Sequence, residues 1–236
     1  MAVVAIIGAM EEEVALIAAS LDNVQQEHAA SLNVAHGSLT ASDGSEIEVA
    51  ATVGGMGLVN AAATTQYLID TYHPDAILFS GIAGNLNKNL HINDVVLGGT
   101  LRYLDTDMRL IAQWKPKTDD FHSDPRLLSV AEEVLQQLEI NHIVGTIASG
   151  NYFVDTPEKT AAVIEATQAD AVEMEGAAIA HVSARNDIPV LIIRALSDNA
   201  DTDYEDFRHF DISEYANNAA HITVEITRRV PVAIEK

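Results

Sequence analysis

The chain has 236 residues, of which 48% are hydrophobic, and its formal net charge at pH 7 is −22. This length is enough for one sizeable core, and the hydrophobic content excludes a disordered chain. The negative charge argues against nucleic acids and anionic membranes as partners, because both would repel the surface. The chain has no cysteine, which excludes disulfides, thiol nucleophiles and thiolate metal sites.

Short apolar runs bounded by glycines or turn residues predict the strands of a buried sheet. They are continuously apolar rather than alternating, which is typical of strands covered on both faces in a mostly parallel or mixed sheet. Ser42–Gly44 lies between the strand-like Leu39–Ala41 and Ile47–Ala51 and predicts a hairpin turn. The predicted strands are Val3–Gly8, Ile47–Gly55, Ala76–Gly84, Asp94–Gly99, His142–Gly150 and Val190–Asp198.

Helical patterns alternate with these strands. Pro74 stops one helix, and Pro157 follows the N-cap residue Thr156 of another. The predicted helices are Glu11–Leu21, Leu58–Tyr72, Arg126–Leu138, Lys159–Ala166 and Ile212–Arg229. No linker or repeat divides the chain, so we predict one α/β domain over residues 1–236, a central mixed, mostly parallel sheet covered by helices.

No apolar run approaches the ~20 residues that span a bilayer. The first apolar run lacks a basic flank and is cut off by Glu11–Glu13, so it does not predict a signal peptide, and we expect a cytoplasmic protein. Ligands of such sheets bind at the carboxyl ends of the strands. Those ends carry the sequences GAMEEE, GGMG, SGIAGN, SGNYF and RALSD, where we expect the pocket.

Carboxylates recur at this predicted edge. Glu11–Glu13 open a helix, whose free N–H groups favour negative charge, yet one or two acids would satisfy that preference. Glu173 and Glu175 flank Met174 in an apolar stretch and would project to one side if the segment is extended. A carboxylate buried there needs hydrogen-bond partners, which a ribose or a structural arginine could supply.

Arg194, Ser197 and Asp198 lie at the end of the last predicted strand. A carboxyl whose pKa is raised by burial can act as a general acid at neutral pH, whereas a close guanidinium lowers the pKa. Asp198 is therefore either a general acid or a cap for the next turn.

Other motifs are incomplete. GGMGLVN is a partial dinucleotide fingerprint with Asn60 in place of the third glycine, and no phosphate-cradling GxxxxGK[ST] loop is present. DNADTDYEDF lacks the glycine and the terminal glutamate of a calcium loop, and the nine histidines are scattered. We therefore expect no metal site and no cofactor.

Five segments together resemble the 5′-methylthioadenosine/S-adenosylhomocysteine nucleosidases of the purine nucleoside phosphorylase-like superfamily. They are IIGAMEEEV, VNAAATTQYLID, PDAILFSGIAGNL, AVEMEGAAIAHV and RALSD. The resemblance implies a three-layer α/β/α fold, a homodimer and hydrolysis of the bond between adenine and a thio-substituted ribose. The implied substrates are 5′-methylthioadenosine and S-adenosylhomocysteine, with 5′-deoxyadenosine as a further candidate, in methionine salvage and methyl-cycle recycling.

The resemblance also implies roles for the polar residues. Asp198 would protonate the leaving adenine at ring nitrogen 7, and Ser197 would help to hold it. Glu13 would orient and deprotonate the attacking water, with Arg194 close to the water and the carboxylates. The two glutamates before Glu13 would then be partners of the helix dipole and solubilising charge.

The implied substrate-binding residues surround these groups. Glu175 would accept hydrogen bonds from the ribose hydroxyls, Met174 would pack against the sugar, and Phe153 and Val154 would sandwich adenine. A late-loop aromatic, either Phe207 or Phe210, would close the alkylthio pocket. The remaining implied contacts are Met10, Ile82, Ala83, Gly84 and Glu173.

Some positions depart from the family pattern and leave the preferred nucleoside open. Ile82, Leu58 and Asn151 stand where serine, lysine and aspartate are usual, and Tyr103–Pro125 lacks the usual stretch rich in glycine and tyrosine. Three rival functions follow: a phosphorolytic enzyme on the same fold, a hydrolase of another purine nucleoside such as a futalosine-type one, and a non-catalytic nucleoside-binding protein.

Overall fold

The computed structural model describes residues 1–201, 204–207, 209 and 211–234. The strands are β1 (Ala2–Gly8), β2 (Asp22–Ala29), β3 (Leu32–Thr40), β4 (Glu46–Val53), β5 (Ala76–Asn85), β6 (Val95–Tyr103), β7 (His142–Ser149), β8 (Ala171–Glu173) and β9 (Val190–Asp198). The helices are α1 (Glu11–Ala19), α2 (Leu58–Tyr72), α3 (Met108–Ile111), α4 (Pro125–Gln137), α5 (Pro157–Thr167), α6 (Gly176–Arg185), α7 (Tyr204–Phe207), α8 (Ser213–Thr227) and α9 (Val230–Ile234).

The strands form one mixed sheet that closes on itself at one end. Its order is β2-β3-β4-β1-β5-β8-β7-β6-β9, and a further pairing of β9 with β5 completes a ring. The predicted α/β class and mixed sheet are confirmed, whereas the closed end is a feature that the predicted three-layer arrangement does not contain. Because β1, β5 and β9 run parallel, their carboxyl ends meet at one edge, and Gly81 lies opposite Arg194.

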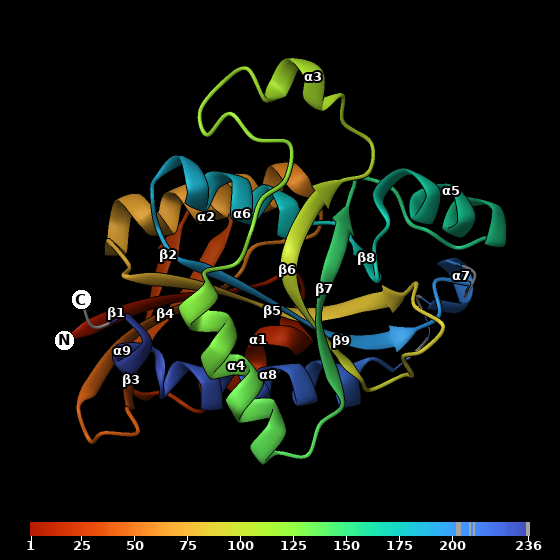
Figure 1. Cartoon of the computed structure of the whole chain (residues 1–236). Coiled ribbons are helices and arrows are strands. Elements are labelled where there is room, and N and C mark those ends of the chain that lie inside the picture. Colours follow the sequence, from red (N-terminus) through yellow and green to blue (C-terminus); the bar gives the residue numbers. More distant parts are fainter. Residues whose placement is uncertain (202–203, 208, 210, 235–236) are drawn as a thin grey trace.

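Apolar side chains on the two faces of the sheet build two cores. Leu78 and Leu191 belong to the core that faces α1, α4 and α8, whereas Phe79 and Ile192 belong to the core that faces α2 and α6. These two groups of helices lie below and above the sheet in Figure 1. The continuous apolar runs of β5 and β9 are explained by this arrangement, because both faces of these strands are covered.

The predicted strands and helices are confirmed to within a few residues. The sequence did not predict elements that apolar periodicity does not mark. The strand β2 was not predicted, because it is a polar edge strand with mostly exposed side chains. The stretch that begins at Ala171 is extended only as far as Glu173 and then turns into α6. The predicted hairpin turn at Ser42–Gly44 joins the antiparallel strands β3 and β4.

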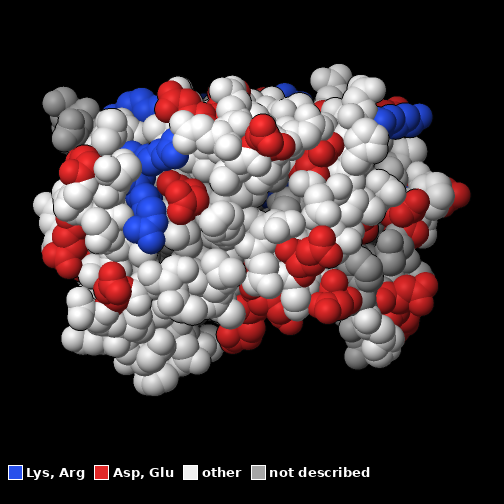
Figure 2. All heavy atoms as spheres, turned by 90° about the horizontal axis from the view of Figure 1, so that it is seen from below, with Lys and Arg blue, Asp and Glu red and all other residues white. Residues whose placement is uncertain are grey.

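The surface carries most of the charge. On the face shown in Figure 2, acidic side chains are spread widely, whereas basic side chains occupy a few places. This distribution fits the formal charge of −22. Within the ranges described, none of the helices combines the length and apolar character that crossing a bilayer requires.

A histidine joins three strands at the sheet edge. His36 on β3 places Nδ1 3.0 Å from Glu27 Oε1 on β2 and Nε2 2.8 Å from Glu48 Oε1 on β4. Tyr72, at the end of α2, donates to the other Glu27 oxygen at 2.6 Å. Burial alone would lower the pKa of His36, but the Glu48 and Glu27 carboxylates favour the imidazolium and raise the pKa above its ordinary value.

We expect His36→Gln to destabilise the protein mainly under acidic conditions. A group with a raised folded-state pKa stabilises the fold fully below its unfolded pKa, and this effect is lost as pH rises through the folded value. The midpoint of thermal unfolding should fall by about 2–4 °C near about pH 5.5, and by less at about pH 9. An equal fall at both pH values would contradict the stabilising bonds between the protonated His36 ring and the two carboxylates. His28→Gln is the control, because the His28 ring contacts Asn33 rather than a carboxylate.

Candidate active site

Glu13 reaches the interior from the first turn of α1. Its side chain is buried, whereas Glu11 and Glu12 are exposed. Its Oε2 accepts the N–H groups of Ala9 at 2.6 Å and Met10 at 3.0 Å, and its Oε1 accepts the Ile82 N–H at 3.0 Å. Three backbone donors, two from the turn between β1 and α1 and one from β5, therefore fix the carboxylate in one orientation.

The environment makes Glu13 a stronger base than an ordinary glutamate. Burial raises the pKa of Glu13, while Arg194 and the three backbone N–H groups offset part of the rise. A carboxylate with a raised pKa takes up a proton closer to neutral pH, which suits general-base chemistry.

Arg194 on β9 is fully buried among these acids. Its guanidinium carbon lies 3.7 Å from the centroid of the Phe79 ring, and its Nη2 donates to Glu173 and, at 3.4 Å, to Glu175. Its Nε and Nη1 are buried and have no hydrogen-bond partner among the described residues. A buried guanidinium N–H without a partner is costly, so Nη1 marks a place where a ligand oxygen would be stabilised.

Gly81 makes room for Glu13 and Arg194 to face each other. A Cβ on Gly81 would lie 2.1 Å from Arg194 Nη1 and 2.3 Å from Glu13 Oε1, so any side chain there would collide with both. Gly81 is not among the site residues predicted from the sequence. Gly81 is the first of the two glycines of SGIAGN, and its place directly opposite Arg194 follows only from the register of β5 and β9.

The two acids of the AVEMEG segment have different surroundings. The Glu173 carboxylate accepts hydrogen bonds from the Ser149 hydroxyl, Arg194 and the N–H groups of Glu175 and Gly176, and so is saturated by the protein. It binds the N-terminus of α6, where free N–H groups need acceptors. Glu173 therefore holds Arg194 and α6 in place.

Glu175 has weaker partners. Its Oε1 accepts the Gly57 N–H at 2.8 Å, and its Oε2 lies 3.3 Å from the Met174 nitrogen and 3.4 Å from Arg194. Burial and then the Glu173 carboxylate raise the pKa of Glu175 to about 8, although Arg194 and the Gly57 N–H favour the charged form. Glu175 is thus the acid of the pair with capacity for ligand hydroxyls.

Asp198 ends β9 at the same edge of the sheet. The Ser197 hydroxyl donates to Asp198 Oδ2 at 2.8 Å, and the Ala200 N–H donates to Oδ1 at 2.7 Å. A Cβ on Gly84 would lie 3.3 Å from Oδ1, so this glycine allows close approach. Arg194 and Asp198 are four residues apart on one strand, about 13 Å, a separation comparable to the length of a nucleoside.

The structure describes most of the other predicted contact residues. Val154 is buried against Ala200, beside Asp198, in a small apolar cluster, and Phe153 is half-buried next to it. Met10 packs against Ile82 near the start of α8. The remaining predicted residues are Ala83, which is buried, Met174, which is half-buried, Phe207, whose backbone ends α7 but whose side chain is not described, and Phe210, which lies outside the described residues.

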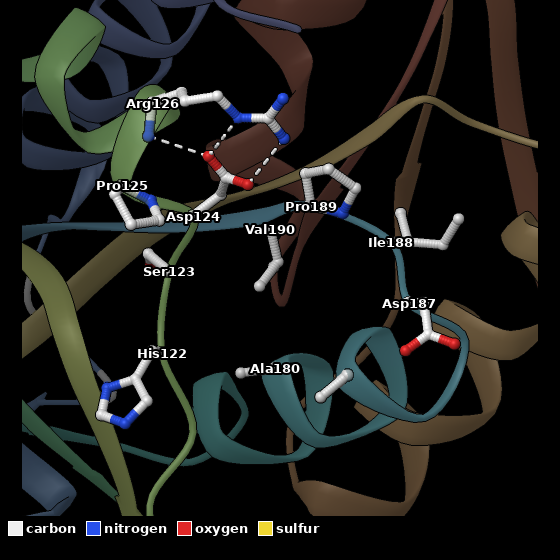
Figure 3. A pocket seen from close by; sticks show the side chains of 11 residues that line it. His122, Ser123, Asp124, Pro125, Arg126, Ala180, Asp187, Ile188, Pro189 and Val190 are labelled. Carbon is white, nitrogen blue, oxygen red and sulfur yellow. Dashed lines mark hydrogen bonds and ion pairs between the residues drawn. The ribbon is translucent and has the colours of Figure 1, made fainter. Parts of the chain in front are cut away.

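A separate hollow lies at the opposite end of β9 (Figure 3). It has a volume of about 370 Å³ and is bordered by Val190 at the start of β9 and by Ala180 of α6. The charged side chains of Asp124 and Arg126 at its wall bind each other at 2.9 Å. It is therefore distinct from the carboxylate cluster. In the part of the chain that the structure describes, no group of three His, Asp or Glu side chains could hold a metal ion.

Known proteins of similar sequence and fold identify the family of this chain. Residues 3–228 match the family model of the Phosphorylase superfamily. A 5′-methylthioadenosine/S-adenosylhomocysteine nucleosidase of Shewanella sediminis is 36% identical, and the match covers 92% of this chain and 94% of that protein. The chain belongs to this nucleosidase family.

Solved structures of the superfamily share the fold over almost the whole chain. The S-adenosylhomocysteine nucleosidase of Streptococcus pyogenes in complex with 5-methylthiotubericidin is 30% identical, with a TM-score of 0.89 and 98% of each chain covered. A futalosine hydrolase of Helicobacter pylori is 29% identical, with a TM-score of 0.83 and coverage of 95% of this chain and 97% of that one. Members of the nucleosidase family therefore share this fold with a hydrolase of a different nucleoside.

We expect Glu175→Gln to stabilise this nucleosidase family member at alkaline pH. Because the folded pKa of Glu175 is raised to about 8, the folded state loses stability as pH rises from the unfolded pKa through that value. Glutamine keeps the acceptor for the Gly57 N–H without the charge. The midpoint of thermal unfolding should rise by about 5 °C at about pH 9 and change little at about pH 5. A variant that is equally or less stable at alkaline pH would contradict this account of the buried charge.

Proposed function

We propose that the chain hydrolyses the N-glycosidic bond of 5′-methylthioadenosine and S-adenosylhomocysteine, with 5′-deoxyadenosine as a further substrate. The products are adenine and the corresponding ribose. The observation that carries the proposal is the pair of Glu13 and Arg194 facing each other over Gly81, with Asp198 at the end of the strand that carries Arg194. The nucleosidase relatives support the same reaction.

The leaving base is assigned to Asp198. Cleavage of the bond between the sugar carbon C1′ and adenine moves the bonding electron pair to the base. Protonated Asp198 donates its proton to ring nitrogen 7, so that adenine leaves as a neutral molecule. The Ser197 hydroxyl and the Ala200 N–H hold the two carboxyl oxygens and so direct the proton.

The attacking water is assigned to Glu13 and Arg194. Positive charge develops on the sugar as the base departs, and the water oxygen forms the new bond to C1′ while Glu13 accepts its proton. Arg194 Nη1 can donate to the water oxygen, because it faces Glu13 and no described residue accepts its N–H. Glu175 would accept the ribose hydroxyls, which stabilise its buried charge.

The balance of charge disfavours a phosphorolytic reaction. Glu13, Glu173 and Glu175 surround the single guanidinium of Arg194, and a phosphate dianion placed there would be repelled by the excess of carboxylates. The futalosine hydrolase among the structural neighbours favours a second candidate, hydrolysis of a futalosine-type nucleoside by the same residues.

The decisive experiment is incubation with 5′-methylthioadenosine in phosphate-free buffer, with free adenine as the readout. We expect rapid release that added phosphate does not accelerate. Release only after phosphate is added would overturn the assignment of Glu13 to water. Faster release of base from a futalosine-type nucleoside than from 5′-methylthioadenosine would move the function to the second candidate.

We expect Glu13→Gln and Asp198→Asn each to reduce kcat by about 10²–10⁴-fold, because each removes one proton transfer. Both amides keep the size and most hydrogen bonds of the acids, so thermal unfolding should show folded variants. Glu12→Gln is the matched control, because Glu12 is an exposed neighbour in the same helical turn. Adenine release by either active-site variant at the wild-type rate would contradict this mechanism.

We further propose that the protein is a cytoplasmic homodimer, as the family resemblance implies. Large apolar side chains near the start of α2 and around α3 support an interface between copies. Val59, Leu110 and Trp114 expose 78%, 65% and 79% of their surface. Both elements lie on the upper side of the molecule in Figure 1. Apolar side chains that are exposed together on one side are typical of protein interfaces.

A further inference from the structure

The N-terminus of α2 is bound by two side chains from distant parts of the chain. The Gly57 N–H donates to Glu175 Oε1 at 2.8 Å, and the next N–H, that of Leu58, donates to Asn151 Oδ1 at 3.0 Å. The first N–H groups of a helix have no partner within the helix and need acceptors. Gly57, in the N-cap position, has no side chain to supply one. The two acceptors therefore come from outside, one of them from the acid assigned to the ribose.

Asn151 is itself fixed between the segments that surround the site. It follows β7 and precedes Phe153 by two residues, and its backbone N–H donates to Asp105 Oδ2 at 2.9 Å. A Cβ on Gly57 would lie 3.4 Å from Asn151 Oδ1, so the side chain lies directly against this turn. One residue thus joins the start of α2 to the segment that carries the predicted adenine contacts.

We propose that Asn151 is a positioning residue: by binding the Leu58 N–H, it holds the neighbouring Gly57 N–H on Glu175 and so sets the orientation and charge of that carboxylate. This inference rests on the proposed function, in which Glu175 accepts the ribose hydroxyls.

The charges around Glu175 explain why one N–H group matters. Glu173 on β8 and Glu13 on α1 disfavour the ionised form, and burial acts in the same direction. Arg194 on β9 and the Gly57 N–H are the groups that favour it. Loss of the hydrogen bond from the Gly57 N–H would raise the pKa of Glu175. The carboxylate would no longer be held in one orientation and would bind the ribose less well.

The side chain of Asn151 supplies an acceptor without adding charge. An aspartate would accept the same N–H, and carboxylates are good acceptors at helix N-termini. It would, however, place another negative charge beside Asp105 and the cluster around Arg194. The amide therefore gives the same bond at a lower electrostatic cost in this acidic protein.

The test compares Asn151→Ala with Asn151→Asp and with the control Asn60→Ala. Asn60 lies in the same first turn of α2, but its side chain donates to the Met56 carbonyl and not to a residue of the site. For 5′-methylthioadenosine hydrolysis by Asn151→Ala, we expect kcat/KM to fall about three- to tenfold, mainly through KM, and its acidic limb to move to higher pH. Asn151→Asp should recover most of kcat/KM at alkaline pH, because the aspartate side chain accepts the same Leu58 N–H.

A measurement without substrate separates the inference from the proposed function. Carbon-13 NMR of the glutamate carboxyls, assigned with Glu175→Gln, should show Glu175 titrating at higher pH in Asn151→Ala than in the wild type. An unchanged titration, or the same shift in Asn60→Ala, would overturn the role of Asn151. A wild-type protein that releases no adenine would overturn the proposed function and leave the titration to decide the inference.

Discussion

The site depends on one buried guanidinium shared by too many carboxylates. Arg194 is surrounded by Glu13, Glu173 and Glu175, so three carboxyl groups share one positive charge in the interior. Such an arrangement is costly to fold and raises the pKa of the acids that the protein does not saturate. Glu173 is saturated by its neighbours, which leaves Glu13 and Glu175 as the acids poised for a ligand. Such an electrostatic cost is typical of functional sites, where the arrangement that catalysis needs lowers the stability of the fold.

Backbone N–H groups, rather than further cations, make the cluster tolerable. Glu13 receives three of them, two from the turn between β1 and α1 and one from β5, and Glu175 receives one from the start of α2. Such donors are neutral and rigid, so they orient a carboxylate and stabilise its charge without pairing it with a further cation. The parallel strands supply them because their carboxyl ends meet at one edge of the sheet.

The excess of negative charge connects the site with the rest of the molecule. The surface is acidic as well, with a formal net charge of −22 for the chain, so a neutral nucleoside is a more suitable ligand than a phosphate. The same excess explains why a neutral acceptor at Asn151 suits this protein. The electrostatic effect of a substitution in the site therefore depends on the charge of all its surroundings.

The sequence by itself determined the α/β class, most strands and helices, and the acids that line the sheet edge, because apolar runs and helix signals are local. It also separated Glu13 from its two exposed neighbours through the family resemblance. Only the tertiary structure decided which acid of the AVEMEG segment is saturated, why Gly81 must be a glycine, and how Asn151 and Gly57 reach the site. These contacts join residues far apart in the chain, and they depend on strand order and register, which hydrophobic periodicity does not encode.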